Sequence, residues 1–279
     1  MRGWQRYVKI IVGGAILLVL VVSGVAAPLL APYDPREQRL ANRLQPPSLT
    51  TERGRYILGT DNLGRDLLSR IIYGSRISLL VGAATVVLAG LFGCIVGAIA
   101  GYFGEMVDEV ISKTTEIFLA FPFLLLAIAI MAFLGQGVFN LILALVLSRW
   151  VQYCRVVRGE VLSLREREFV QAARALGGKD LYIIARHVLP NTLPSVMVIA
   201  TFAMAIVIIA EASLSFLGLG VPPSVPTWGS MLSEGRSYMY RAPWLTIFPG
   251  MAIFITVLGI NLLGDGLRDI LDPKLSRQG

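Results

Sequence analysis

The segment Ile77–Ala100, ISLLVGAATVVLAGLFGCIVGAIA, contains no charged residue. As a helix that rises 1.5 Å per residue it would be about 36 Å long, enough to cross the roughly 30 Å hydrocarbon core of a bilayer. Gly93, Gly97 and Gly101 recur every four residues and leave one helix face without side chains. Such a face lets two membrane helices approach closely, although glycine is also tolerated in membrane helices without this role. We predict a membrane span that packs tightly against a neighbour.

The rest of the chain is also strongly hydrophobic. Of its 279 residues 55% are hydrophobic and 15% are charged, and the mean hydropathy is +0.70, values that do not suit a soluble domain. Cys94 and Cys154 lie in apolar segments without a disulfide spacing pattern, so we expect free thiols. The prediction is an all-α polytopic membrane protein with six transmembrane helices, the other five at Ile10–Leu30, Ile117–Leu134, Val138 to about Cys154, Ser195 to about Leu217, and Leu245–Leu263.

The first apolar segment has an alternative interpretation as a cleavable signal peptide. Arg2, Arg6 and Lys9 precede it, and Ala26-Ala27 could be a processing site. The uncharged run from Ile10 to Leu30 exceeds the 7 to 15 residues typical of a signal-peptide core, which favours a span.

Lys and Arg predict the orientation. With the N-terminus inside, the inner segments carry 14 of these residues and the outer loops carry 10, and seven of the 14 lie between Arg155 and Arg186. Because cytoplasmic loops are enriched in Lys and Arg, we expect both termini in the cytoplasm. The net charge of +7 is explained by this topology, since no nucleic-acid-binding motif accompanies the dispersed arginines.

Between the fourth and fifth predicted spans lies SLREREFVQAARALGGKDLYIIARHVLPNTLP, residues 163–194, which is predicted to form two short helices. Ser163 and Glu166 have capping-box spacing and would begin the first helix. Gly177-Gly178 would end it with a left-handed turn. Its apolar face would consist of Phe169, Ala172, Ala173 and Leu176.

The second short helix of this loop is predicted to begin at Asp180 as its cap and to run to about Leu189. Pro190 and Pro194 would separate it from the fifth span. A short amphipathic helix held between two spans suits a groove on another protein. It equally suits a helix that rests on lipid headgroups, and physical reasoning alone leaves both possibilities open.

The order Gln171-Ala172-Ala173, Gly177 and Leu189-Pro190 resembles the EAA loop of permease subunits of bacterial ATP-binding-cassette importers, at the family's spacing. Gln171 replaces the family's Glu, and His187 stands at an Ile position. The resemblance implies that this loop is a coupling helix that docks on an ATP-binding subunit. The docking residues it implies are Glu168, Phe169, Gln171, Ala172, Ala173, Leu176, Gly177, Leu189 and Pro190.

Five further blocks resemble the C-type permease subunit of dipeptide, oligopeptide and nickel importers. They are Leu58–Gly82, Gly101–Glu109, Glu211–Pro223, Thr227–Leu232 and Asn261–Leu275. The resemblance implies the type I (MetI-like) importer permease fold in the bacterial inner membrane. It also implies three segments: residues 1–76 as a first helix with a long outer loop, 77–272 as a five-helix core with its coupling loop at about 160–192, and 273–279 as a cytoplasmic tail.

The same resemblance implies an alternating-access importer, with peptides favoured as cargo and nickel or a metal chelate as the alternative. The implied partners are a homologous permease subunit, two ATP-binding subunits, an extracytoplasmic substrate-binding protein and the lipid bilayer, with no nucleic acid. The chain lacks a phosphate-binding loop, so we expect a non-enzymatic subunit without a cofactor or metal, and MgATP bound by its partners. A membrane protease is disfavoured, because the single histidine, His187, falls in the inner loop.

Polar residues inside predicted spans leave an ion-coupled secondary transporter as a rival of another class; they are Asn140, Arg149, Glu211 and Asn261. Glu211 and Ser215 are candidates for a gate or a translocation path, although pairing of Glu211 with an arginine of a loop or subunit would explain it structurally. Arg149 is expected to pair or to extend toward the inner leaflet.

Aromatic residues near the outer surface are expected to form an interfacial belt rather than a ligand cage; they are Trp228, Tyr238, Tyr240 and Trp244. For the outer loop 31–76, contact with a companion subunit and ordinary loop packing are equally good explanations.

Overall fold

The computed structural model describes residues 2–49 and 55–271, and within these ranges every regular element is a helix apart from one isolated bridge between Thr60 and Asp66. Five helical runs are long and apolar enough to cross a membrane, and a bent pair supplies a sixth crossing if it counts as one span. The five are α1 (Arg2–Val25), α3 (Leu67–Phe103), α6 (Val138–Leu164), the run Asp180–Phe216 that ends in α9, and α11 (Trp244–Leu271). The bent pair is α4 (Glu105–Leu119) with α5 (Phe123–Leu134).

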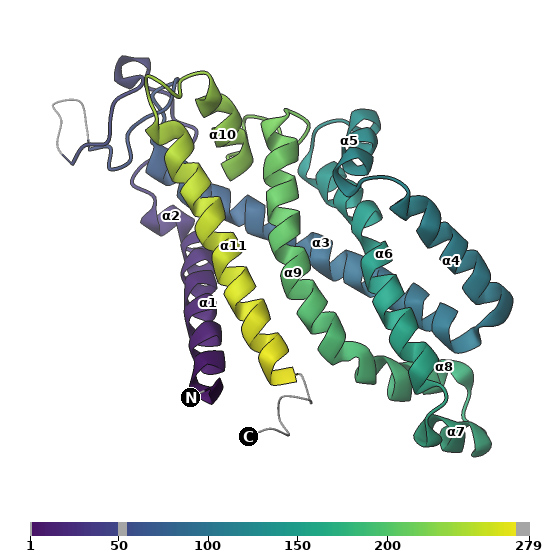
Figure 1. The fold of residues 1–279 in the computed structure, drawn as a ribbon. Helices are drawn as coiled ribbons and strands as arrows, with labels where there is room; N and C mark the ends of the chain where they lie inside the picture. Colours follow the sequence, from purple (N-terminus) through teal and green to yellow (C-terminus); the bar gives the residue numbers. More distant parts are fainter. Residues whose placement is uncertain (1, 50–54, 272–279) are drawn as a thin grey trace.

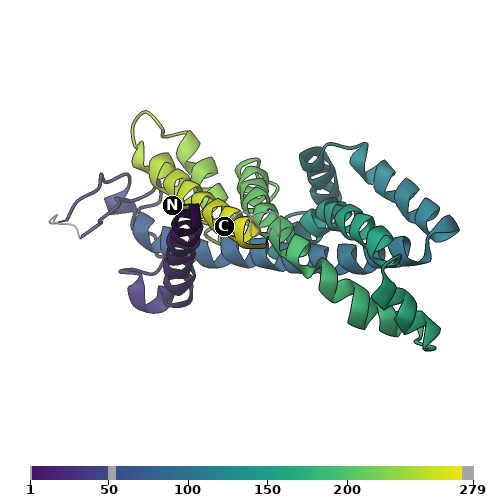
Figure 2. The same cartoon turned by 60° about the horizontal axis from the view of Figure 1, so that its bottom comes forward.

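The helices form a row, with α1, α11, α9, α6 and α4 side by side and α3 crossing obliquely behind them (Figures 1 and 2). Both ends of the described chain lie at the end of the bundle that carries α7 (Glu168–Ala175). An ion pair of 3.0 Å between Lys9 and Asp269 joins the first and last helices there. An even number of crossings, with the bent pair counted as one, accounts for this arrangement.

The small-residue face predicted on the second span packs as expected. A Cβ added at Gly93, Gly97 or Gly101 would lie under 3.0 Å from the backbone carbonyl oxygen of Trp150, Cys154 or Arg158, respectively. These three carbonyls follow one another at four-residue intervals on α6. The glycines therefore allow α3 and α6 to approach backbone to backbone, as predicted.

The predicted third span, Ile117–Leu134, is wrong as a single helix. The chain breaks after Leu119 and turns by 86° before α5 begins. Pro122 is the N-cap of α5, with an extended ψ of 129°. The residue before a proline is disfavoured in the helical region and proline itself donates no backbone hydrogen bond, so the helix ends rather than merely bending.

The second span begins earlier than the predicted Ile77, because α3 begins at Leu67. Asp66 caps it by accepting a 2.8 Å hydrogen bond from the Ser69 backbone N–H, which provides a strong start signal. The first span likewise ends at Val25, and α2 (Ala27–Leu30) follows as a separate turn.

At the bundle end opposite α7, charged side chains join the outer loop to α10 (Trp228–Arg236). Asp61 accepts from Arg65 and Arg70 at 2.5 Å, and Glu234 accepts from the same two arginines at 2.7 Å. Asp61 and Arg70 are both buried. The loop is thus packed onto the core of this chain by a buried ion-pair cluster.

The expected aromatic belt is wrong for Trp228, while Trp244 is partly exposed. Trp228 is completely buried and donates to the Ile71 carbonyl, and Trp244 donates to the Thr60 carbonyl. Both indoles hold α10 and α11 to the start of α3 and its loop. Tyr240, at 99% exposure, keeps the outward position that a belt requires.

Candidate functional site

The short helix α7 projects beyond the ends of the spans (Figure 1). It begins at Glu168, with Arg167 in the N-cap position and no side-chain cap. The predicted Ser163–Glu166 capping box is wrong, because α6 continues to Leu164 and Ser163 lies inside it. A tight turn at Arg165–Arg167 then redirects the chain into α7, with the Arg167 N–H bonded to the Leu164 carbonyl.

One side of α7 is anchored to the spans. Val170 is fully buried in an apolar cluster with partly buried Ala173, and the other members come from α3, α6 and the start of the α9 run, namely Ala98, Tyr102, Val157, Val161, Ile183, Ile184 and Val188. The Arg174 guanidinium lies 5.1 Å from the centre of the Tyr102 ring. Interaction with the Tyr102 hydroxyl raises the pKa of Arg174 above its usual value.

The other side of α7 presents apolar side chains that nothing in the described chain covers. Phe169 is 43% exposed and Leu176 is 89% exposed, with exposed Ala172 between them. Polar Glu168 and Gln171 flank this face and are also exposed. The predicted apolar face is therefore divided: Ala173 turns inward, while the other three residues form the outward face of α7.

Gly177 ends α7 as predicted. Its φ of +82° lies in the left-handed region that favours glycine. The Gly178 N–H bonds to the Ala173 carbonyl and the Gly177 N–H to the Arg174 carbonyl, each at 3.0 Å. This is the bonding pattern of a Schellman-type helix end.

The predicted second helix of the loop is not separate from the fifth span. Helix α8 (Asp180–Ile183) continues through a π-helical turn, η2 (Ile184–Val188), into α9 (Leu189–Phe216). Leu189 donates to the Ile184 carbonyl across this turn, and Pro190 and Pro194 both lie within α9. A π-turn accommodates prolines that cannot supply the usual helical hydrogen bond.

Asp180 is likewise not a cap. It is the first residue of α8, and its carboxylate accepts a 2.8 Å hydrogen bond from the Tyr102 hydroxyl. The run from Asp180 to Phe216 is thus tied to α3 at its α7 end. It forms one continuous connection from α7 to the opposite end of the bundle.

Glu211 and Ser215 lie near that opposite end of α9. Glu211 is fully buried, and its carboxylate accepts hydrogen bonds from Ser215 at 2.9 Å and from Ser78 of α3 at 3.1 Å. No arginine pairs with Glu211 among the described residues, and pairing with an arginine of another subunit stays a prediction. The two serines make Glu211 a polar junction between α3 and α9.

Arg149 is buried rather than extended toward a surface. Its guanidinium stacks 4.1 Å from the centre of the Phe123 ring and donates to Gln152 at 2.9 Å. Phe123 is the first residue of α5, so Arg149 braces the break in the α4–α5 span.

The arrangement of these helices matches a chain of known structure. A chain of the MetNI methionine ABC transporter in an inward-facing conformation superposes with a TM-score of 0.60 at 18% identity, covering 74% of this chain and 98% of that chain. The chain belongs to the family described as binding-protein-dependent transport system inner membrane component, whose model matches residues 93–277. Ion-coupled secondary transport is therefore not its class.

A second family model, the N-terminal TM domain of oligopeptide transport permease C, matches residues 10–47, so the first apolar segment is a transmembrane domain. The dipeptide transport system permease protein DppC of Alkalihalophilus pseudofirmus is 45% identical over 95% of this chain and 86% of its own length. The oligopeptide transport system permease protein OppC of Bacillus subtilis is 40% identical over the same shares. The glutathione transport system permease protein GsiD of Pectobacterium atrosepticum is 41% identical over 98% of this chain and 90% of its own length.

Proposed function

We propose that this chain is one of two membrane subunits of an ATP-driven, binding-protein-dependent importer of short peptides. The observation that carries the proposal is the outward apolar face of α7, uncovered in the chain and anchored behind by Val170. An apolar face on a short, firmly held helix suits a groove on a partner protein. Peptides are the proposed cargo, because the relatives that share the whole chain are named for dipeptide, oligopeptide and glutathione transport.

The proposed partners are a homologous permease, two ATP-binding subunits and a soluble receptor outside the membrane. MgATP binds to the ATP-binding subunits, and this chain supplies docking and a passage but no catalysis. In this assignment α7 and both termini face the cytoplasm. The docking contacts are Glu168, Phe169, Gln171, Ala172 and Leu176, with Ala173, Gly177, Leu189 and Pro190 shaping the helix and its exit.

Movement of the docked α7 reaches the far end of the bundle through the α8–η2–α9 run. From Asp180 to Glu211 this run is about 47 Å long at 1.5 Å per residue. Its far end is joined to α3 through the hydrogen bond between Glu211 and Ser78. We infer that separation of this junction accompanies opening of the passage, which gives Glu211 and Ser215 the role of a gate.

The test is reconstitution of the complete complex in proteoliposomes with receptor outside and MgATP inside. We expect uptake of radiolabelled Ala-Ala that requires both receptor and ATP hydrolysis. Uptake of nickel ions but not of peptides would replace the cargo assignment. Ion-driven uptake by this chain alone would overturn the proposal.

A further inference from the structure

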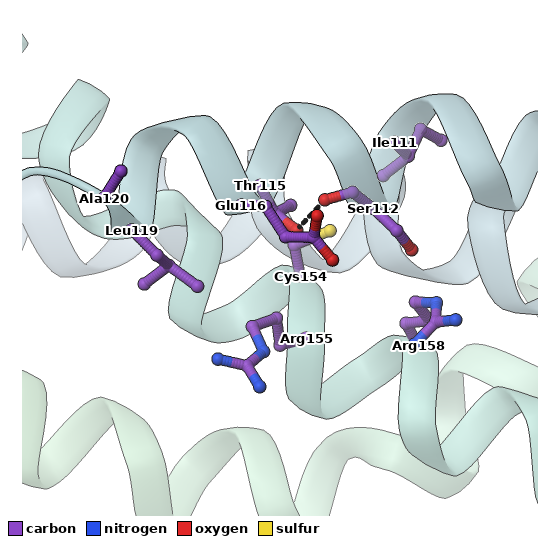
Figure 3. Close-up of a pocket in the computed structure, with 9 residues that line it drawn as sticks. All are labelled: Ile111, Ser112, Thr115, Glu116, Leu119, Ala120, Cys154, Arg155 and Arg158. Atoms are coloured by element: carbon purple, nitrogen blue, oxygen red, sulfur yellow. Dashed lines mark hydrogen bonds between the residues drawn. The ribbon is translucent and has the colours of Figure 1, made fainter.

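A pocket of about 360 Å³ lies between α4 and α6, next to the break in the α4–α5 span (Figure 3). Leu119 and Ala120 at the end of α4 form the border nearest the break, and Cys154 and Thr115 lie deep between the helices. The volume falls in the range of small-molecule sites, which begins at about 300 Å³.

Two opposite charges face this pocket without partners. Glu116 of α4 and Arg155 of α6 both line the pocket, and Figure 3 shows their charged groups well apart from each other. Both residues are exposed, and neither side chain makes a hydrogen bond or ion pair within residues 2–49 and 55–271. By contrast Arg158, on the same wall, is paired with Asp108 through two hydrogen bonds.

Charges at such positions call for a polar ligand. A charged side chain in a membrane-spanning segment is costly unless it faces water, a partner or a substrate path. Glu116 and Arg155 would satisfy each other if they were in contact, yet no ion pair joins them. The pocket therefore keeps a negative and a positive site apart.

The helix break strengthens the negative site. Glu116 lies one turn before the end of α4, at Leu119, where unsatisfied backbone carbonyls carry partial negative charge. An ammonium group would be favoured there. Arginine binds carboxylates in a bidentate fashion, so Arg155 favours a carboxylate on the facing wall.

We propose that this pocket is a cargo subsite for the two charged ends of a short zwitterionic peptide, with the ammonium group at Glu116 and the carboxylate at Arg155. An extended dipeptide spans at most about 7 Å, short enough for such a pocket. This inference rests on the proposed function and deepens it, because it names the chemical feature of the cargo that the permease itself recognises.

The experiment measures direct binding of radiolabelled Ala-Ala to the purified complex without its receptor, with competition by Ala-Ala, N-acetyl-Ala-Ala and Ala-Ala-amide. In the unaltered complex we expect Ala-Ala to compete about tenfold better than either blocked peptide, because each lacks one charge worth about 1.4 kcal/mol or more. Glu116→Gln should abolish the preference over N-acetyl-Ala-Ala alone. Arg155→Gln should abolish the preference over Ala-Ala-amide alone, and Arg155→Lys should restore part of it.

Lys113→Gln is the matched control, since Lys113 is an exposed charge on α4 that pairs with Glu109 away from the pocket. It should leave both preferences unchanged. Absence of Ala-Ala binding, or unchanged preferences in the Glu116 and Arg155 variants, overturns the subsite. Loss of the companion permease on purification of these variants also overturns it, in favour of a contact between subunits. Receptor-dependent uptake in the unaltered complex tests the proposed function separately.

Discussion

The two ends of the bundle differ in whether their side chains find partners within the described chain. At the end with α7, Phe169, Ala172 and Leu176 point away from the protein and leave apolar surface uncovered. At the other end, the carboxylates of Asp61 and Glu234 pair with two arginines, Arg65 and Arg70, so the four charges balance one another. In the proposed assembly the first end docks on a partner and moves with it, whereas the second end is a fixed frame. The two ends are separated by the length of the membrane helices.

The largest effect, on assembly and uptake, should follow from a charge placed on the outward face of α7. Ala172→Glu adds a carboxylate to the outward face of α7, which must then be buried in any docked complex. We expect ATP-binding subunits to be lost on purification and peptide uptake to fall at least about tenfold, since an unpaired interfacial charge costs several kcal/mol. Ser163→Glu, an exposed position at the end of α6, is the control and should retain both. Normal co-purification of Ala172→Glu would contradict the comparison.

Breaking the ion-pair cluster at the other end should affect stability instead. Asp61→Asn leaves two buried arginines with only Glu234 as a counter-charge, and removal of one partner from a buried pair destabilises by about 3–5 kcal/mol. A lower thermal unfolding midpoint of the purified subunit would register this loss. Lys113→Gln removes one partner of an exposed pair and should leave the midpoint unchanged. Equal midpoints for the two variants would show that the outer cluster is not a structural frame.

Between the ends, the contact of α3 with α6 should tolerate no added methyl group. Gly97→Ala would place a Cβ under 3.0 Å from the Cys154 carbonyl oxygen and should destabilise by about 1–3 kcal/mol through overpacking. Gly14→Ala is the control, since nothing lies within 4 Å of its added Cβ, and alanine is favoured over glycine in helices. Unfolding in a denaturant series would compare them. A stable Gly97→Ala variant would mean that the two helices separate readily.

The smallest effect on stability should come from Glu211→Gln. Glutamine retains an oxygen that can accept from Ser78 or Ser215, so we expect a change of about 1 kcal/mol or less. Glu211→Ala removes both acceptors and should cost about 1–3 kcal/mol. If Glu211 acts only as a structural junction, Glu211→Gln should retain full uptake. A selective loss of uptake in a stable Glu211→Gln variant would support the gate.

The sequence predicts the spans well where hydrophobicity alone decides them, and the α3–α6 contact where glycine spacing does. It fails where tertiary structure competes with local signals. The segment Ile117–Leu134 was expected to be one helix and is broken before Pro122, while Pro190 and Pro194 were expected to separate two helices and lie within one run. The π-helical turn Ile184–Val188 lets the helix continue into the segment with Pro190 and Pro194, and the propensities of single residues do not predict such a turn.

For the candidate site too, local sequence patterns predicted some features and missed others. The glycine pair predicted the end of α7 correctly, and periodicity identified its outward apolar residues. It did not reveal that Val170 provides the anchor, because the orientation of a helix depends on which surface the neighbouring spans offer. The pocket residues Glu116 and Arg155 come from separate helices, so no local pattern links them. Their signal was only that each is a charge near or within a predicted span.

The most direct test of the account is photo-crosslinking from the outward face of α7. A benzoylphenylalanine placed at Leu176, the more exposed of the two large apolar residues on this face at 89%, would be activated in membranes that contain the complete complex. We predict one main product that joins this chain to an ATP-binding subunit, weakened by Ala172→Glu. Crosslinks to lipid alone, or to the external receptor, would contradict the assignment of α7 as the docking helix.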